Sequence, residues 1–212
     1  MTNNLNIRTV VVGAFQVNCF VVWKEPPEAL VIDPGEDAEA VAAVLKQENL
    51  TVAAYLLTHG HMDHVSGLAD LYDLFPAPVA MHAEDLEWAF TEHNQMMPYG
   101  TPRRPPEVAR TLADGQEWTD AGLTYRVIGT PGHTTGGVSF YFPEEKVVFA
   151  GDTLFAGSVG RTDFSGGSSR MLGESLKKLA NFPDDTVVYC GHGPQTTIGH
   201  EKRTNYFMQG GF

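Results

Sequence analysis

The hydrophobic positions along the chain fall into short runs separated by turn residues, which predicts a strand-rich protein. In the first half, β-branched and apolar runs predict strands at residues 5–12, 17–23, 29–32, 52–57 and 78–81. The glycine-containing stretch between the first two runs predicts a hairpin. Apolar side chains that recur at helical spacing predict helices at residues 37–48, 63–74 and 83–92.

The second half repeats this grouping after a long polar connection. Residues 94–110 are rich in proline and predict a loop, which we expect to be a variable surface segment rather than a lid. Strands are predicted at 123–128, 138–142, 147–150 and 186–189, and helices at 168–180 and 198–207. Two groups of strands, each followed by helices, predict an α/β fold with two facing sheets and helices outside. We expect residues 1–212 to form one domain.

Composition narrows the classes of protein to consider. Hydrophobic residues make up 42% of the chain, yet no run reaches the roughly 18 apolar residues of a membrane helix. Acidic residues outnumber basic ones by 26 to 14, which argues against a nucleic-acid-binding surface. The polar start lacks a secretion signal pattern, and the two cysteines, Cys19 and Cys190, form no disulfide framework. We therefore expect a cytoplasmic protein whose thiols are small core residues.

One stretch is dense in side chains that bind metals. Residues 58–64 read Thr-His-Gly-His-Met-Asp-His and directly follow the apolar run 52–57. A strand that ends there would leave three imidazoles and a carboxylate on a loop at the edge of a sheet. Folding alone does not require this density, so the stretch predicts half of a metal site.

Three later strands end in turns where a glycine directly precedes a possible ligand. These turns present His133, Asp152 and His192. Glycine lets the backbone bend sharply or lets another segment approach closely. Together with the first stretch, they give seven nitrogen and oxygen ligands and no thiolate: His59, His61, Asp63, His64, His133, Asp152 and His192. This set favours two divalent metal ions per chain, with zinc as the first choice and iron or manganese as alternatives.

The order of these motifs resembles that of the metallo-β-lactamase superfamily, from about Gly13 to His192. The resemblance implies an αββα four-layer sandwich with the metals at one edge between the sheets. It also implies a role for each ligand: His59, His61 and His133 hold the first ion, Asp63, His64 and His192 hold the second, and Asp152 bridges them. A true β-lactamase is not expected, because that class usually has a cysteine in the second site.

Within the superfamily, the residues after Gly151 and the glycine loop 157–167 resemble glyoxalase II, the hydroxyacylglutathione hydrolases. That likeness implies a small-molecule thioester substrate, a glutathione conjugate such as S-lactoylglutathione. Longer glyoxalase II enzymes grip glutathione with a C-terminal helical domain, whereas a short helix and tail at 198–212 stand here. Their glycine loop carries a lysine and a tyrosine where this chain has Arg161 and Asp163. Arg161 is therefore the candidate contact for a substrate carboxylate.

The implied reaction is attack of a metal-bridging hydroxide on the thioester carbonyl. Two ions can lower the pKa of a shared water toward about 7. A thiolate leaves without being protonated, so the lack of a spare acid beside the ligands favours thioesters over amides. Asp63 and Asp152 are the candidate catalytic carboxylates, Asp63 as a ligand that also accepts a proton and Asp152 as the bridge.

Two other functions fit the same residues. The Gly-Arg-Thr-Asp-Phe segment at 160–164 also resembles the persulfide dioxygenases, which share the scaffold but use one iron. Their three ligands would be His59, His133 and Asp152, and the complete second ligand set argues against this alternative. A degenerate domain used for binding is a third hypothesis, but such domains typically lose ligands. The sequence does not predict the oligomeric state.

Other polar residues receive structural interpretations. Asp33 is expected to cap its own turn, and a second role near the metals is not predicted. Three histidines outside the motifs are interpreted as structural: His82, His93 and His200.

Overall fold

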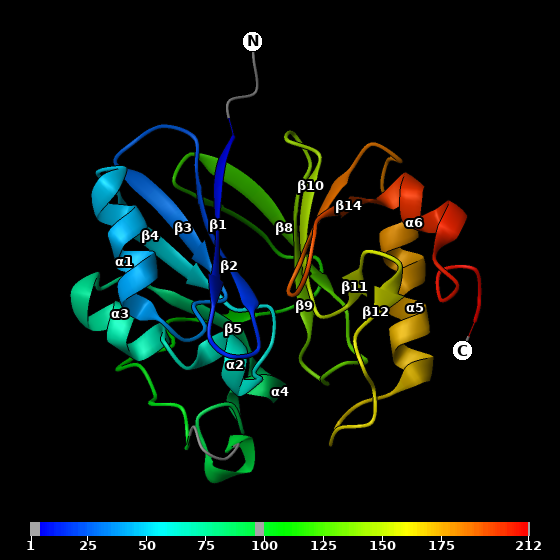
Figure 1. Cartoon of the computed structure of the whole chain (residues 1–212), viewed down its shortest axis with the longest axis horizontal. Coiled ribbons are helices and arrows are strands. Elements are labelled where there is room, and N and C mark those ends of the chain that lie inside the picture. Colours follow the sequence, from blue (N-terminus) through cyan, green and yellow to red (C-terminus); the bar gives the residue numbers. More distant parts are fainter. Residues whose placement is uncertain (1–4, 96–99, 212) are drawn as a thin grey trace.

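The computed structural model describes residues 5–95 and 100–211. Two six-stranded sheets face each other, and helices cover their outer faces (Figure 1). The strand order is β1-β2-β3-β4-β5-β6 in the first sheet and β14-β13-β10-β9-β8-β7 in the second. This arrangement confirms the expected αββα four-layer sandwich.

The first sheet and its helices come from the first half of the chain. Its strands are β1 (Asn6–Val12), β2 (Val17–Trp23), β3 (Glu28–Ile32), β4 (Thr51–Leu56), β5 (Val79–His82) and β6 (Arg110–Leu112). The helices are α1 (Ala38–Gln47), α2 (Met62–Val65), α3 (Leu68–Leu74), α4 (Ala83–Leu86) and the 3-10 helix η1 (Glu92–Asn94). Strands β3 and β4 pair in parallel, so both end at the same edge of the sheet.

The second half of the chain builds the other sheet. Its strands are β7 (Glu117–Asp120), β8 (Leu123–Gly129), β9 (Val138–Phe142), β10 (Val147–Gly151), β13 (Val187–Cys190) and β14 (Thr196–Thr197). A small hairpin of β11 (Leu154–Phe155) and β12 (Ser158–Val159) precedes the helices α5 (Ser169–Ala180) and α6 (Ile198–Thr204). Strands β10 and β13 are parallel, so they too end at a common edge.

Burial on both faces of the sheets explains the apolar runs in the sequence. Every residue of β2 is buried. Phe20 and Val22 face the core between the two sheets together with Phe149, whereas Val21 packs with Leu45 of α1 on the outer face. A third cluster joins the second sheet to α5 and α6. Strands covered on both faces lose the alternation of polar and apolar residues, as the sequence shows.

The expected helix at 63–74 is wrong in one respect, because two helices, α2 and α3, replace it. The break lies at Gly67, where a β-carbon would clash with the carbonyl oxygen of Gly35. A β-carbon at Gly35 would likewise clash with the Asp63 carbonyl oxygen. The loop after β3 therefore packs directly against the backbone of this segment, and the close approach interrupts the helix.

The segment after β5 also differs from expectation. The helix predicted at 83–92 ends early, as α4, and turns and η1 follow it. Asn94 accounts for part of this difference, because its side-chain amide donates to the Ala89 carbonyl at 2.6 Å. Within the predicted loop 94–110, Asn94 is buried and Arg103 pairs with acidic residues of α3, while residues 96–99 lie outside the described part of the chain.

Five short strands were not predicted: β6, β7, β11, β12 and β14. Each has two to four residues, too few for a periodic pattern to stand out. Among the described helices, none combines the length and apolar character needed to cross a membrane.

Candidate metal centre

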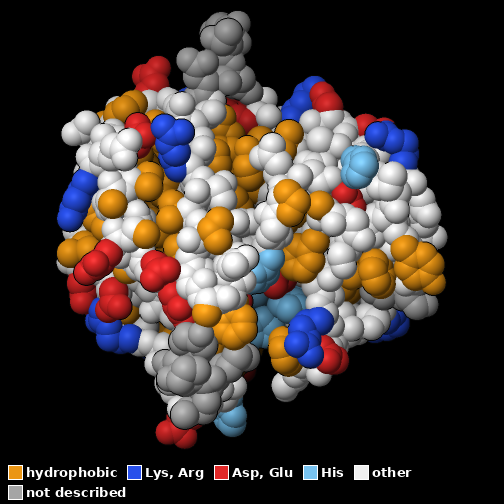
Figure 2. Space-filling model, viewed as in Figure 1, with side chains coloured by type: hydrophobic (Ala, Val, Ile, Leu, Met, Phe, Trp, Pro, Cys, Tyr) orange, Lys and Arg blue, Asp and Glu red, His pale blue; other side chains and the backbone are white. Residues whose placement is uncertain are grey.

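Four strand ends bring the predicted ligands to one seam between the sheets. His59 follows β4 in the first sheet. Asp152 follows β10 and His192 follows β13 in the second sheet, and His133 lies on the loop after β8. Because β10 and β13 run parallel, their carboxyl ends meet at one edge. Figure 2 shows histidine side chains gathered at the seam between the two halves of the molecule.

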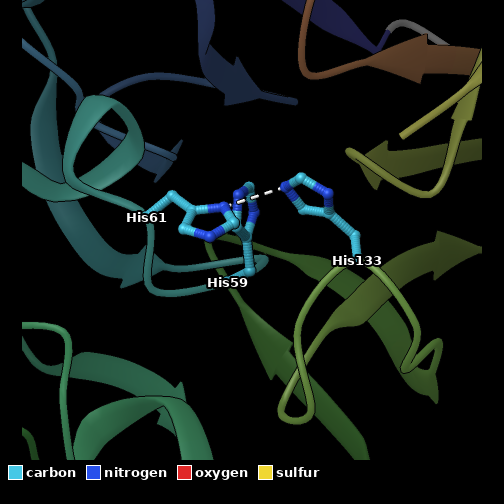
Figure 3. A group of neighbouring side chains, drawn as sticks. All are labelled: His59, His61 and His133. Carbon is cyan, nitrogen blue, oxygen red and sulfur yellow. Dashed lines mark hydrogen bonds between the residues drawn. The ribbon is translucent and has the colours of Figure 1, made fainter. Parts of the chain in front are cut away.

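Three histidines form the first group. His59, His61 and His133 each offer a ring nitrogen, and these nitrogens lie within 4.8 Å of one another. His61 Nδ1 is 2.9 Å from His133 Nε2. In Figure 3 the rings converge on one point, with two of them carried by the loop after β4 and the third by the loop after β8.

Outer hydrogen bonds fix how two of these rings present their nitrogens. His133 donates from Nδ1 to the Arg161 carbonyl oxygen at 2.7 Å. The Thr58 hydroxyl donates to Asp33 at 2.6 Å, so it can accept the Nδ1 proton of His59 at 3.0 Å. In both rings the proton therefore sits on Nδ1, and Nε2 keeps a lone pair directed inward.

A second group lies beside the first. Asp63, His64 and His192 place ligand atoms within 4.8 Å of one another. The Asp63 Oδ2 atom is 3.5 Å from His192 Nε2 and 4.0 Å from His64 Nε2. His192 donates from Nδ1 to the Phe15 carbonyl oxygen at 3.0 Å, which leaves its Nε2 free for a ligand role.

Asp152 lies between the two groups. Its Oδ2 is 3.4 Å from His133 Nε2 in the first group and 3.5 Å from His192 Nε2 in the second. Its Oδ1 is 3.4 Å from His64 Nε2. A β-carbon at Gly191 would clash with Oδ1, so only glycine leaves room for the carboxylate at this turn. All seven predicted ligands are thus brought together, and Asp152 lies within 3.5 Å of ring nitrogens of both groups.

Three atoms in this cluster test whether metals would fit. His59 Nε2, His64 Nε2 and Asp152 Oδ1 are buried and make no hydrogen bond, although the last two face each other at 3.4 Å. Buried polar atoms without partners are costly and rare unless an ion or water satisfies them. The donor set is nitrogen and oxygen only, because Cys19 and Cys190 are buried outside all the ligand groups of the described residues. This chemistry fits two divalent ions.

Protons balance the charges of the metal-free cluster. Burial lowers the pKa of His59, and the charge of His64 lowers it further. Burial opposes the shift at His64, but Asp152 and Asp63 still raise its pKa well above the ordinary value. Burial likewise opposes the shift at Asp152, whose pKa His64 holds well below the usual range. At His192 the pKa rises to about 9, because its pairing with Asp152 and Asp63 outweighs burial. Divalent cations would take over the role of these protons.

The structure corrects the interpretation of Asp33. Its side chain is fully buried and accepts from the Thr58 amide at 2.7 Å, the Thr58 hydroxyl at 2.6 Å and His64 Nδ1 at 3.0 Å. Although Asp33, His59 and His64 also satisfy the spacing of a ligand group, these three donors already occupy the Asp33 carboxylate. Asp33 therefore holds His64 in place from behind.

Two further residues that position the site were missed. Asp85 is buried and accepts from the Gly60 amide at 2.9 Å and from the Gly136 amide at 2.7 Å, so it ties together the two histidine-bearing loops. Asn94 accepts from the Met62 amide at 3.1 Å and holds the start of α2. The sequence signal for both is slight: each is a single polar residue within a segment otherwise assigned to a helix or a surface loop.

The histidines interpreted as structural stay outside the centre. No ligand group among the described residues includes His82, His93 or His200. His82 instead accepts from the Glu84 amide at 3.3 Å and caps α4.

A family model matches the part of the chain that contains all seven predicted ligands. Residues 12–192 match the family model described as the metallo-beta-lactamase superfamily. The chain belongs to the metallo-beta-lactamase superfamily. The resemblance seen in the motifs is therefore confirmed, together with the fold that it implies.

Similar superfamily members carry different names. Hydroxyacylglutathione hydrolase GloC of Haemophilus influenzae is 35% identical over 96% of this chain and 98% of its own length. The crystal structure of the BLEG-1 B3 metallo-beta-lactamase has a TM-score of 0.89 and 38% identity, covering 97% of this chain and 100% of that one. The crystal structure of TTHA1623 in a di-iron-bound form has a TM-score of 0.84 and 38% identity, and the match covers 94% of this chain and 99% of that one. The crystal structure of ETHE1 from Myxococcus xanthus has a TM-score of 0.78 and 27% identity, and the match covers 94% of this chain and 83% of that one.

The rim of the centre in this superfamily member is aromatic. The rings of Trp88 and Phe164 lie 5.5 and 5.3 Å from the ring of His61, centroid to centroid. The Arg161 guanidinium carbon lies 4.0 Å from the centroid of the Phe164 ring. The predicted substrate contact, Arg161, thus stands beside the first histidine group.

Proposed function

We propose that this protein is a metal-dependent hydrolase of thioesters, acting on glutathione thioesters such as S-lactoylglutathione. The observation that carries the proposal is the pair of ligand groups joined by Asp152, with three buried atoms inside them that lack partners. The likeness to a relative named as a hydroxyacylglutathione hydrolase supports the substrate class. In this proposal two divalent ions are bound, with zinc first and iron or manganese as alternatives.

The ligand assignment follows the two groups. The first ion would be held by His59, His61 and His133, the second by Asp63, His64 and His192, and Asp152 would bridge them. When bound, such ions supply Lewis acidity and an activated water at neutral pH. The bonds that Arg161, Thr58, Asp33 and Phe15 make to the Nδ1 atoms of His133, His59, His64 and His192 aim the Nε2 atoms inward, where bound cations would replace the protons of His64 and His192.

Proton transfer is assigned to Asp63. Its side chain is 20% exposed, whereas that of Asp152 is 10% exposed, so Asp63 is the carboxylate with better access to substrate and solvent. Burial tends to raise the pKa of Asp63, but His64 lowers it, and the group is therefore ionised at neutral pH and able to accept a proton. A thiolate leaving group needs no further acid, which fits a thioester better than an amide.

Arg161 remains the proposed contact for a carboxylate of the substrate. It lies at the rim, its backbone carbonyl orients His133, and its guanidinium is exposed. We also propose that residues 1–212 work as one domain in the cytoplasm, where Cys19 and Cys190 remain reduced.

The test is hydrolysis of S-lactoylglutathione by protein of measured metal content. Asp152→Ala and His133→Ala should lose activity by more than about 100-fold, because each removes a proposed ligand and opens the cluster. His200→Ala is the matched control, since His200 is an exposed histidine outside every ligand group of the described residues, and it should retain activity. Metal-replete protein that hydrolyses no acylglutathione thioester would refute the proposal.

The second candidate is a persulfide dioxygenase that uses one iron. The segment 160–164 and the similarity to ETHE1 favour it, and the complete second ligand group opposes it. One iron per chain together with persulfide-dependent oxygen uptake would decide for this candidate. The similarity to BLEG-1 makes a chromogenic cephalosporin a necessary comparison substrate, on which we expect weak or no activity because its amine leaving group needs protonation.

A further inference from the structure

The guanidinium of Arg161 is already engaged by a carboxylate of its own loop. Arg161 Nε donates to Asp163 Oδ1 at 2.6 Å, and Arg161 Nη2 donates to Asp163 Oδ2 at 2.7 Å. This two-bond geometry is the one that an arginine offers to any carboxylate, including that of a substrate. The bond to Arg161 lowers the pKa of Asp163 to about 2, so Asp163 is fully ionised at neutral pH.

The pair stands directly at the metal centre. The Arg161 backbone carbonyl accepts the Nδ1 proton of His133, and the ring of Phe164 lies edge-on against His61. The contact with the Phe164 ring holds the exposed guanidinium over the rim of the centre. A substrate whose carbonyl reaches the cluster would therefore bring its thiol carrier or acyl group close to this pair.

The pair is not needed to hold the loop. The side chains of Arg161 and Asp163 are 58% and 66% exposed, and exposed ion pairs contribute little to stability. Other contacts fix the segment: the bond from His133 to the Arg161 carbonyl, the bond between Thr162 and Ser169 at 2.8 Å, and the close packing of Gly160 against the Asp152 backbone. Removal of the Asp163 charge should therefore change what Arg161 binds without moving the metal ligands.

We propose that Asp163 is a specificity-determining residue, whose carboxylate occupies the Arg161 fork and weakens the binding of thioesters with an anionic carrier relative to uncharged thioesters. The inference rests on the proposed function and deepens it. An anionic group that approaches Arg161 must displace or share the place of Asp163 and is repelled by its charge. An uncharged thioester encounters neither effect.

The test compares two lactoyl thioesters in the metal-loaded enzyme. S-lactoylglutathione carries carboxylates, whereas the lactoyl thioester of N-acetylcysteamine is uncharged. Asp163→Asn should raise kcat/KM for the first about 1.5- to 5-fold, the range expected for one exposed ion pair, mainly through KM. For the uncharged thioester kcat/KM should stay constant, and the gain on S-lactoylglutathione should shrink as salt is raised.

Two further variants show whether the effect is specific. Asp185→Asn removes the same charge from a similar exposed pair, Lys146 with Asp185 at 2.6 Å. That pair lies at the starts of β10 and β13, opposite the strand ends that carry the centre. The Asp185→Asn control should therefore leave kcat/KM unchanged for both thioesters. In an Arg161→Gln background, Asp163→Asn should give a clearly smaller gain on S-lactoylglutathione, because only the direct repulsion by Asp163 remains; an undiminished gain would show that Asp163 does not act by occupying Arg161.

Binding of a substrate analogue provides a readout that does not depend on turnover. S-methylglutathione has the carboxylates of glutathione but no thioester, and calorimetry should show it binding more tightly to Asp163→Asn by a similar factor. If hydrolysis persists but Asp163→Asn leaves both the affinity and the substrate ratio unchanged, the inference is wrong and the proposed function stands. If no variant hydrolyses either thioester, the proposed function fails, and the inference fails with it.

Discussion

Replacement of Asp33 by asparagine tests how the protein orients a proposed metal ligand. The change keeps the shape of the buried side chain but replaces one carboxylate oxygen with an NH₂ group. The remaining oxygen can still accept from the Thr58 amide. The new NH₂ group then faces His64 Nδ1, which also carries a proton. Two donors cannot bond, so the neutral form of His64 that binds a metal would carry its proton on Nε2, the atom aimed into the centre.

The size of the effect follows from the bond that is lost. A hydrogen bond to a charged group is worth about 1.5–3 kcal/mol. If His64 must recover the Nδ1 tautomer against this cost in order to bind a metal, affinity at its site falls roughly 10- to 100-fold, the usual range for partners behind a ligand. The other site should weaken as well, because the replaced Oδ2 atom also accepts the proton of the Thr58 hydroxyl, and that hydroxyl in turn accepts from His59 Nδ1.

The assay is metal affinity, measured by competition with a chromogenic chelator, together with thermal unfolding of the metal-free protein. Glu201→Gln is the matched control: Glu201 is also fully buried and accepts three bonds, from Gly157, Thr196 and Asn205. It should lose stability without losing metal affinity. A folded Asp33→Asn protein that binds both metals as tightly as the wild type would show that Asp33 does not orient His64.

Other predictions concern the support of the centre and its protons. Asp85→Ala leaves two buried loop amides without an acceptor and should lower the free energy of unfolding by about 2–6 kcal/mol, measured by urea denaturation. Gly191→Ala should push Asp152 aside and cut metal affinity at least about 10-fold, whereas thermal unfolding should show that the protein still folds. In metal-free protein the folded pKa of His192, about 9, exceeds its ordinary 6.5, so its stabilisation is complete below about pH 6.5 and is lost as the pH rises through 9. His61, whose pKa burial lowers to about 4, destabilises the fold as the pH falls from 6.5 toward 4. Urea denaturation in the presence of a chelator should therefore give maximal stability near neutral pH; stability that keeps rising between pH 7 and 9 would contradict this reasoning.

The ligand positions of the centre could be predicted from the sequence because the patterns that mark them are local. A strand is visible as an apolar run, and a glycine just before His133, Asp152 or His192 marks the turn that ends it. Parallel pairing then places the ends of neighbouring strands at one edge, so a strand-by-strand prediction gathers ligands that lie far apart in the sequence.

The support of the centre could not be predicted in this way. Asp33 bonds to a residue 31 positions away, and Asp85 bonds to an amide 51 positions away. Nothing in the residues next to either aspartate indicates such a partner, and each has an adequate local interpretation as a turn or helix residue. The break at Gly67 has the same origin, because it depends on an approach of Gly35 that only the tertiary fold creates.

We propose that a two-metal centre built from the seven ligands hydrolyses thioesters. The most direct measurement follows S-lactoylglutathione hydrolysis while metal-free protein is titrated with zinc, iron or manganese, with bound metal counted at each point. We predict that activity rises to its maximum at two ions per chain and that Asp152→Ala removes it. Saturation at one iron per chain, with no thioester hydrolysis but with persulfide-dependent oxygen uptake, would contradict the account.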